Sequence, residues 1–297
     1  MGNLFKAFFY KIRKDITFRI TLFIGLGFSI LIPLLLFIID LAIHAMSEGG
    51  EFVHALCNGQ ALLIMSFSPT QNFGLAIPIN LITFTVLEFT NGTIRNKIIS
   101  GYSKTKIFFG LFFTGLIYTF MLISGYVLIS FGLGCAFGGF DLKNSVMILS
   151  ALSGGQLTGE FLWKFILLAL LGYVVIASMT IFFATLFRHI GPAIPVVIIL
   201  VVLCSGMASI YTVVELLGGG EGSEGVSQFM KFLAQFMRAV NPIHSILVFD
   251  STTDPNTYET FMKIKWDSFF IELANNLVYI ALFCGFGWLL FAKRDVK

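Results

Sequence analysis

The sequence predicts an all-α integral membrane protein with an N-terminal amphipathic elbow helix, six transmembrane helices, and short extracytoplasmic helices between the fifth and sixth spans. Composition is the first indication, because 57% of the residues are hydrophobic and only 12% are charged, against about 25% charged in a soluble domain. The second indication is a set of six long apolar segments, and the third is a one-sided distribution of lysine and arginine. The 297 residues leave no room for a large soluble domain beside these spans, so we expect one transmembrane domain over residues 1–297.

The apolar segments are close to the length that crosses a bilayer, since about 20 apolar residues span the hydrocarbon core as a helix. The second is the shortest and contains Gly74 and Pro78, which membrane helices tolerate. The first is too long for the core of a signal peptide, so we expect it to be retained. The predicted spans are residues 20–43, 72–87, 107–137, 161–187, 193–217 and 269–291.

The basic residues orient these spans. Thirteen of the nineteen lysine and arginine residues fall in the N-terminal segment, the loop over residues 88–106, the loop at Arg188 and the C-terminus. Basic residues mark the cytoplasmic side of a membrane protein. We therefore expect a multi-pass protein of the cell membrane with both termini in the cytoplasm. The use of isoleucine, lysine and phenylalanine is typical of a bacterium.

The N-terminal segment over residues 1–19 is predicted to be a helix in the cytoplasmic membrane interface. A basic amphipathic helix before a span lies in this position and contacts anionic lipid. Two interpretations remain, a simple lipid anchor and an elbow helix that also contacts a cytoplasmic partner. The apolar face holds Phe5, Phe8, Phe9, Ile12 and Ile16, and the basic face holds Lys6, Lys11, Arg13 and Lys14.

The first outer loop, over residues 44–70, contains His44, His54 and Cys57. Their spacing fits no standard zinc pattern and a fourth ligand is missing, so we expect no metal site. Cys135, Cys204 and the other cysteines form no CxxC pair, which favours small apolar core residues over a disulfide framework.

The loop over residues 88–106 is a polar island between two spans. It reads Glu88-Phe-Thr-Asn-Gly-Thr93-Ile-Arg-Asn-Lys-Ile-Ile99-Ser-Gly101, which predicts a short, basic, amphipathic helix ended by glycine. One interpretation is a handle that a soluble protein grips, and the other is a basic stretch among lipid headgroups. In the span that follows, the small residues Ser130, Gly134 and Gly138 recur every four positions, a spacing that permits close helix contact.

The longest extracytoplasmic segment covers residues 218–268. Its glycine-rich start is typical of a flexible linker, and an apolar stripe that includes Phe229 and Phe236 then predicts a helix that Asn241-Pro242 ends. Fifteen residues give about 22 Å, too short to cross a bilayer. The helix therefore either lies on the outer surface or is re-entrant and closes the outer end of a pathway.

The sequence contains no catalytic set and no nucleotide-binding loop. Gly220 and Gly225 have the spacing of a phosphate loop, but Val226 stands where that loop requires lysine. We therefore expect a protein that is not an enzyme, has no cofactor of its own, and has no nucleic-acid partner.

The polar island and the C-terminus carry a resemblance. Glu88 followed by Asn-Gly-Thr-Ile-Arg-Asn-Lys-Ile-Ile, and the final Phe-Ala-Lys-Arg-Asp-Val, resemble permeases of the type-2 ABC exporter family, in particular bacterial permeases similar to bacitracin and lantibiotic exporters. The resemblance implies a dimer with a second permease protomer, each protomer held by a separate cytoplasmic ATPase that binds ATP and Mg. It also implies that residues 88–106 form the coupling loop.

By that resemblance the coupling helix covers Thr93 to Ile99. Ile94 and Ile98 would be its apolar contacts with the ATPase, and Arg95 and Lys97 its polar contacts. Glu88 would hold the loop against its neighbours, with a basic residue of the N-terminal helix as its partner.

The expected function is the transmembrane permease subunit of an ATP-driven exporter. Its cargo would be an amphipathic peptide, a lantibiotic or a hydrophobic drug, on family analogy alone. Alternatives from other classes are a secondary carrier driven by an ion gradient and a membrane scaffold or sensor subunit that does not transport.

Overall fold

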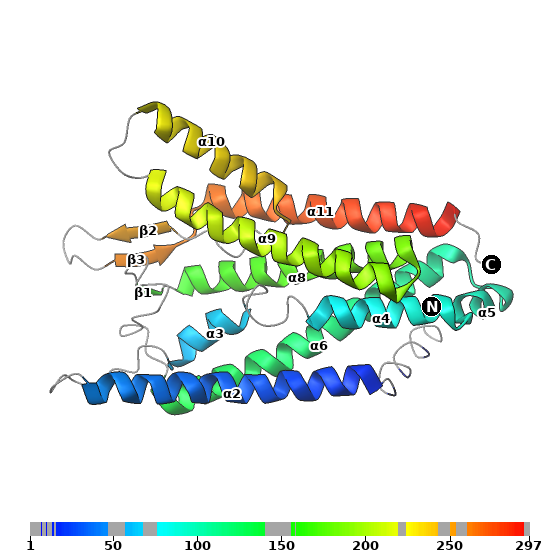
Figure 1. Ribbon diagram of the computed structural model, residues 1–297, viewed down its shortest axis with the longest axis horizontal. Helices are drawn as coiled ribbons and strands as arrows, with labels where there is room; N and C mark the ends of the chain where they lie inside the picture. Colours follow the sequence, from blue (N-terminus) through cyan, green and yellow to red (C-terminus); the bar gives the residue numbers. More distant parts are fainter. Residues whose placement is uncertain are drawn as a thin grey trace.

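The structure is a computed structural model that describes residues 7, 10, 14, 16–46, 57–67, 76–139, 156–157, 159–218, 224–242, 250–253 and 260–293. Long helices lie side by side (Figure 1). We call the end of the bundle that holds the short helix α5 (Thr93–Ile99) the α5 end. The opposite end carries three short strands, and we call it the sheet end.

Helices form at all six predicted apolar segments. Four of them, α2, α6, α8 and α11, are long and apolar enough to cross a membrane, whereas the apolar helical stretches Ala76–Thr90 and Ile190–Cys204 are shorter, as judged over the described residues. The chain is therefore a helical membrane protein, and the set of six complete spans stays a prediction. The helices are α2 (Ile16–Met46), α4 (Ala76–Thr90), α6 (Lys104–Gly138), α8 (Gly159–Phe187), α9 (Ile190–Gly218) and α11 (Trp266–Lys293).

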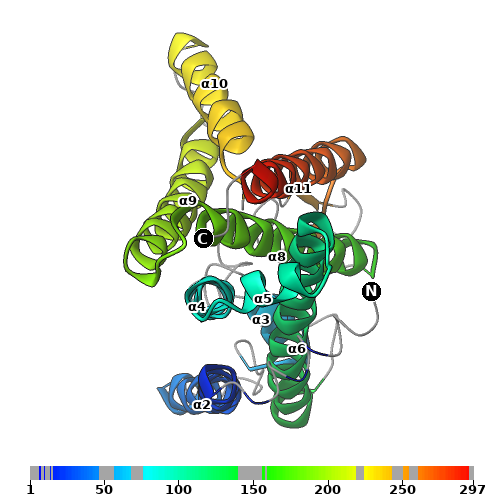
Figure 2. The same cartoon turned by 90° about the vertical axis from the view of Figure 1, so that its right-hand side faces the viewer.

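Helix α8 is the centre of the bundle. Figure 2 looks at the α5 end and shows α4, α6, α9 and α11 around α8, with α2 and α10 (Glu224–Val240) at opposite edges. Ala169, Ala177 and Ala184 of α8 are fully buried. Their small side chains let neighbouring helices approach closely, as is common in membrane helix packing.

Helices α2 and α6 run parallel and in register. The rings of Phe18 and Tyr118 lie 4.7 Å apart between centroids, and those of Phe37 and Phe137 also lie 4.7 Å apart. Both pairs are separated by one hundred positions, so the same register holds along most of α2. Between them, the Ser130 hydroxyl donates a hydrogen bond to the Ser29 carbonyl at 3.3 Å.

The predicted outer loop over residues 44–70 contains a buried helix, α3 (Gly59–Phe67), so the prediction of a loop is wrong for these nine residues. An added Cβ on Gly134 would lie 2.8 Å from the Leu62 side chain and 2.9 Å from the Asn58 carbonyl oxygen, and one on Gly138 would overlap the Cys57 carbonyl. The predicted close contact along the small-residue row is thus confirmed. The nine residues of α3 are too few to span a bilayer, and α3 instead packs against the glycines of α6.

Cys57 ties the start of α3 to α2. Its backbone N–H donates to the Asp40 carboxylate at 2.9 Å, and its thiol donates to the Pro33 carbonyl at 3.3 Å. Burial, with a smaller effect of the charge on Asp40, raises the pKa of the Cys57 thiol to about 11. The thiol is therefore protonated at neutral pH and serves as a hydrogen-bond donor.

Three short strands were not predicted. They are β1 (Gln156–Leu157), β2 (Asp250–Thr253) and β3 (Thr260–Lys263), in the order β1-β3-β2, with β1 parallel and β2 antiparallel to β3. Residues 218–268 thus contain β2 and β3 in addition to a helix. The predicted helix is confirmed by α10, which ends at Val240, just before Asn241-Pro242.

Lys164 joins α8 to the junction between β3 and α11. Its ammonium lies 2.6 Å from Glu160 Oε1, 2.9 Å from the Ile264 carbonyl, and 3.8 Å from the centre of the Trp266 ring. Although Lys164 is 1% exposed, its charge is compensated by a carboxylate, a carbonyl and an aromatic face.

Most of the predicted N-terminal helix lies outside the described residues. Ahead of α2 the structure describes Ala7, Tyr10 and Lys14, which are helical. His54, most of the glycine-rich linker and the last four residues also lie outside them.

We predict that Gly134→Ala will lower the free energy of unfolding by about 1–3 kcal/mol, because α3 must move to make room for the methyl group. The measurement is a denaturant titration of the detergent-purified protein. Gly132→Ala is the matched control on the same helix, since a Cβ at Gly132 meets nothing within 4 Å. Equal changes in the two variants would contradict the close packing of α3 on α6.

Candidate functional site: the α5 loop

The α5 loop, residues 88–106, connects α4 to α6 through one short helix and two tight turns. Gly92 precedes α5 with φ 65° and Gly101 follows it with φ 88°. Both angles lie in the left-handed region, which glycine adopts without steric cost. Helix α6 then begins after Ser103, whose side chain accepts a hydrogen bond from the Lys106 backbone N–H at 3.4 Å. The direction of α5 is therefore set at both of its ends.

Glu88, near the end of α4, is the buried charge of this loop. Its side chain is 1% exposed, and one carboxylate oxygen lies 2.7 Å from Lys97 Nζ and 2.7 Å from the Thr93 hydroxyl. That hydroxyl also lies 2.8 Å from the Glu88 carbonyl oxygen. Hydrogen bonds to an ionised group are about twice as strong as those between neutral groups. Thr93 and Lys97 lie on α5, so the carboxylate fastens α5 to α4.

The faces of α5 differ from those predicted. Ile94 is fully buried in the core, and Ile98 is partly buried against it. Ile99 is 73% exposed, and Arg95 and Asn96 are also exposed. The Ile94 side chain therefore anchors α5 to the bundle in this structure and is not presented to another protein. The outward surface of α5 is formed by Arg95, Asn96 and Ile99.

Aromatic contacts link the α5 loop to α11 and to the turn between α8 and α9. The Phe89 ring packs edge-on against Phe291 with centroids 5.9 Å apart, and the Arg188 guanidinium lies 5.3 Å from the centre of the Phe89 ring. Arg188 has φ 57°, a conformation that costs a non-glycine residue roughly 1–2 kcal/mol. Phe89 is thus the point where three parts of the chain meet.

Polar contacts join the start of α6 to the end of α11. Lys104 Nζ donates to the Ala292 carbonyl at 3.0 Å, and the Trp288 indole N–H donates to the Thr105 hydroxyl at 3.2 Å. Together with Phe89, these contacts connect the α5 loop to the last turns of α11.

Sequence reasoning did not identify Phe89, Arg188, Trp288 or Phe291 as site residues. A single basic residue between two apolar spans is a weak signal at Arg188, and three aromatic residues in a chain with 35 phenylalanines are no signal at all. Their association depends on the helix arrangement.

The predicted partner of Glu88, a basic residue of the N-terminal helix, lies in a segment that is mostly outside the described residues, so that pairing stays a prediction. The structure adds Lys97, which the sequence assigned to a contact with another protein. Among the described residues, no three His, Cys, Asp or Glu side chains gather closely enough to hold a metal ion.

The second candidate region is α10. Phe229 is 62% exposed and Phe236 is 54% exposed. At the end of the helix, the Asn241 side-chain amide donates to the Cys204 carbonyl at 2.8 Å, and the Tyr279 hydroxyl donates to the Ala239 carbonyl at 2.7 Å. Cys204 lies midway along α9 and Tyr279 midway along α11. The C-terminal end of α10 therefore reaches the middle of the bundle.

We predict that Glu88→Ala will lower the free energy of unfolding by about 1–3 kcal/mol, because Lys97 and Thr93 lose a shared acceptor. A double-mutant cycle with Lys97→Met, measured by denaturant titration, should give a coupling energy of about 0.5–3 kcal/mol. Arg95→Gln is the control on the exposed face and should change stability by less than about 0.5 kcal/mol. A coupling energy of zero would show that Glu88 does not hold α5.

A family model described as a protein of unknown function, DUF2705, matches residues 51–297. No curated protein and no solved structure matches the chain. The match includes the α5 loop, α10 and every helix from α3 to α11, which is well over half of the 297 residues. The chain therefore belongs to the DUF2705 family of proteins of unknown function.

Proposed function

We propose that the chain is the transmembrane permease subunit of an ATP-driven exporter of the cell membrane. In this proposal a separate cytoplasmic ATPase binds ATP and Mg, two permease protomers enclose the pathway, and both termini are cytoplasmic. The cargo is an amphipathic peptide, a lantibiotic or a hydrophobic drug. The resemblance of the α5 loop to coupling loops of type-2 ABC exporters supports this choice.

The geometry of α5 is the observation that carries the proposal. A seven-residue helix is too short to be stable alone, yet α5 is fixed by buried Ile94, by Glu88 and by a glycine at each end. A helix that only rests among lipid headgroups does not need a buried carboxylate to hold its position. A helix that receives force from a partner needs such an anchor, because a helix that is not fixed to the bundle would move without moving the other helices.

The outward surface of α5 suits a groove on a soluble partner. Ile99 supplies one exposed apolar anchor, and Arg95 and Asn96 supply polar contacts beside it. Protein interfaces of this type combine a central buried anchor with a polar rim. In the revised assignment Ile99 replaces Ile94 as the apolar contact, and Lys97 acts inside the loop through Glu88.

Contacts at the α5 end give a route by which motion of α5 reaches the spans. Glu88 joins α5 to α4, Phe89 joins α4 to Phe291 of α11, and Arg188 joins α4 to the turn between α8 and α9. A force on α5 would therefore change the tilt of several helices together. Packed helices that move as a group are one of the elements that switch between two arrangements.

In the same proposal α10 is a re-entrant helix that closes the outer end of the pathway. Its end contacts Cys204 and Tyr279, which lie about 20 Å from either end of their helices at 1.5 Å per residue. A helix lying flat on the outer surface would not reach that depth. Helix α10 begins at the sheet end, and β2, the next described element, also lies at the sheet end. This is the arrangement of a helix that enters the bundle without crossing it.

We predict that Ile99→Asp will abolish copurification of the chain with an ABC ATPase encoded beside it, when both are purified through one tag. Losing a central apolar anchor should weaken the complex about 30-fold or more. Ile99→Leu is the matched control and should retain the complex. Because Ile99 is exposed, neither variant should alter the stability of the permease alone.

Three results would contradict this function. Transport by the purified chain driven by an ion gradient, with no ATPase present, would identify a secondary carrier. Stable copurification of Ile99→Asp with the ATPase, together with unchanged ATP-dependent export, would show that α5 is not the coupling contact. A complex that forms but never transports would favour a scaffold or sensor subunit.

We predict that a cysteine at position 236 will react more slowly with a water-soluble maleimide than one at position 229, because residue 236 lies nearer the deep end of α10. Both substitutions, Phe229→Cys and Phe236→Cys, are made in a variant that lacks the four native cysteines. A membrane-permeant maleimide is the control and should label both after solubilisation. Full reaction of both positions with the water-soluble reagent in intact membranes would exclude the re-entrant arrangement.

A further inference from the structure

Exposed aromatic side chains gather where α8 and α11 begin, at the sheet end. Trp163 of α8 is 44% exposed, and Trp266 and Phe270 of α11 are 50% and 57% exposed. The ring centroids of Trp163 and Trp266 lie 5.8 Å apart, and those of Trp266 and Phe270 lie 5.7 Å apart. We call these three residues the aromatic patch. It is one continuous surface to which two helices contribute.

Buried groups hold the aromatic patch in place. The buried Lys164 ammonium lies 3.8 Å from the centre of the Trp266 ring and is paired with Glu160. The buried Phe269 ring packs edge-on against both indoles, with its centroid 5.5 Å from that of Trp163 and 5.7 Å from that of Trp266. The two indole rings are therefore fixed, although about half of each residue is exposed.

The indole N–H groups of the aromatic patch are available to a ligand. Within the described part of the chain, neither the Trp163 nor the Trp266 indole N–H has a hydrogen-bond partner, whereas the Trp288 indole donates to Thr105. Tryptophan suits a place that is apolar around its ring and offers an acceptor to its N–H. The glycerol and ester-carbonyl layer of a phospholipid leaflet is such a place.

The aromatic patch lies where exposed charge gives way to an apolar surface. Lys265 and Asp267, the neighbours of Trp266 in sequence, are both exposed. From residue 268 to residue 287 the only charged residue of α11 is Glu272, which is 1% exposed, and every exposed residue of that stretch is apolar. A change from charged to apolar surface marks the edge of the hydrocarbon core.

A second tryptophan lies at the other end of the same helix. Helix α11 runs from the sheet end to the α5 end (Figure 1), and Trp288 lies near its end. Twenty-two positions separate Trp266 from Trp288, which is about 33 Å along a helix. The hydrocarbon core of a bilayer is about 30 Å thick, and tryptophan is enriched at both of its interfaces.

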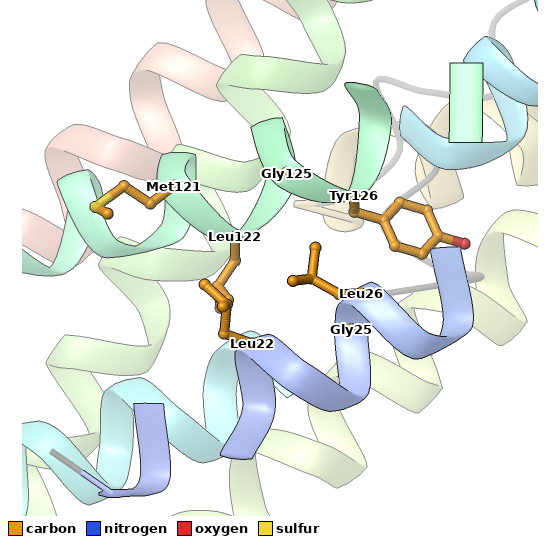
Figure 3. A pocket seen from close by; sticks show the side chains of 7 residues that line it. All are labelled: Leu22, Gly25, Leu26, Met121, Leu122, Gly125 and Tyr126. Atoms are coloured by element: carbon orange, nitrogen blue, oxygen red, sulfur yellow. The ribbon is translucent and has the colours of Figure 1, made fainter. Parts of the chain in front are cut away.

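Helix α2 contains an uncharged stretch of the same length. Arg19 and Asp40 are 21 positions apart, or about 32 Å, and no charged residue lies between them. Figure 3 shows α2 and α6 inside this stretch, where Leu22 and Leu122 point toward one another. Two helices thus independently give the length that crosses a hydrocarbon core.

We propose that the aromatic patch binds the glycerol and ester-carbonyl layer of the phospholipid leaflet at the sheet end, with its indole N–H groups donating to lipid oxygens. Trp288 then lies at the opposite interface, and hydrocarbon surrounds α11 between them. Exposed tryptophans also suit a protein partner. Such a partner would not require another tryptophan one hydrocarbon thickness away on the same helix, so the observations favour lipid. The proposal does not depend on the transport function proposed above.

The test is quenching of tryptophan fluorescence by phospholipids that carry bromine at a known depth. The purified chain is reconstituted into vesicles of phosphatidylcholine brominated either near the glycerol end or near the methyl end of the acyl chains. All three tryptophans of the chain are interfacial in the proposal. The unsubstituted protein should therefore lose more fluorescence with bromine near the glycerol end.

Variants that keep a single tryptophan assign the signal to the aromatic patch. Trp163→Phe combined with Trp288→Phe leaves Trp266, which should be quenched most by bromine near the glycerol end. The matched control is Leu277→Trp, made with all three native tryptophans replaced by phenylalanine. Leu277 is 50% exposed and lies midway between Trp266 and Trp288, so this variant should be quenched most by bromine near the methyl end.

Three outcomes would overturn the proposal. The first is quenching of the unsubstituted protein that is equal for the two lipids or stronger with bromine near the methyl end, and this measurement decides the matter if a variant does not fold. The second is the same depth profile for Trp266 alone and for Leu277→Trp. The third is quenching of Trp266 by neither lipid. Quenching by aqueous iodide would then place the aromatic patch in water, and protection from iodide would assign it to a protein partner.

Discussion

The buried carboxylate of Glu88 is the interaction on which the α5 end depends. A carboxylate buried away from water is unfavourable unless an opposite charge and hydrogen bonds compensate it. Glu88 therefore requires Lys97 and Thr93 to remain where they are, and both residues belong to α5. A helix of seven residues, which has little stability of its own, is in this way made part of α4. Ile94 adds an apolar anchor on the same side. The exposed side chains of α5 are consequently presented on a rigid support.

The helices of the bundle are connected to one another by contacts at both ends and at the centre. The α5 end is joined to α11 by Phe291, Ala292 and Trp288, and α8 holds the centre with small buried residues that allow close packing. Lys164 fixes the sheet end of α8 to the start of α11. Helix α2 lies at the edge and packs mainly against α6, whereas α4 and α11 both pack against α8.

Local signals were enough to predict the helices but not their partners. Apolar length placed all six hydrophobic helices, glycine placed the end of α5, and the spacing of Ser130, Gly134 and Gly138 predicted a close contact. The spacing did not identify α3 as the helix in contact. Residues Gly59–Phe67 are apolar but too short for a span, so no helix was predicted there. The strands escaped prediction because they are two to four residues long, and β1 pairs with β3 far along the chain, Gln156 with Phe261. The contacts that Ile94 and Lys97 make inside the bundle were not predicted, because a helical repeat identifies faces and does not say which face meets the bundle.

Hydrogen exchange of the backbone amides of α5 would show whether Glu88 holds this helix, since amide protection reports how often a segment opens. If Glu88 makes α5 part of α4, the amides of residues 96–99 will exchange as slowly as those at the end of α4 in the wild-type protein. In Glu88→Gln they will exchange much faster, while α4 and α6 keep their protection. Fast exchange of α5 in the wild type, or the same slow exchange in Glu88→Gln, would show that Glu88 does not hold α5 against α4.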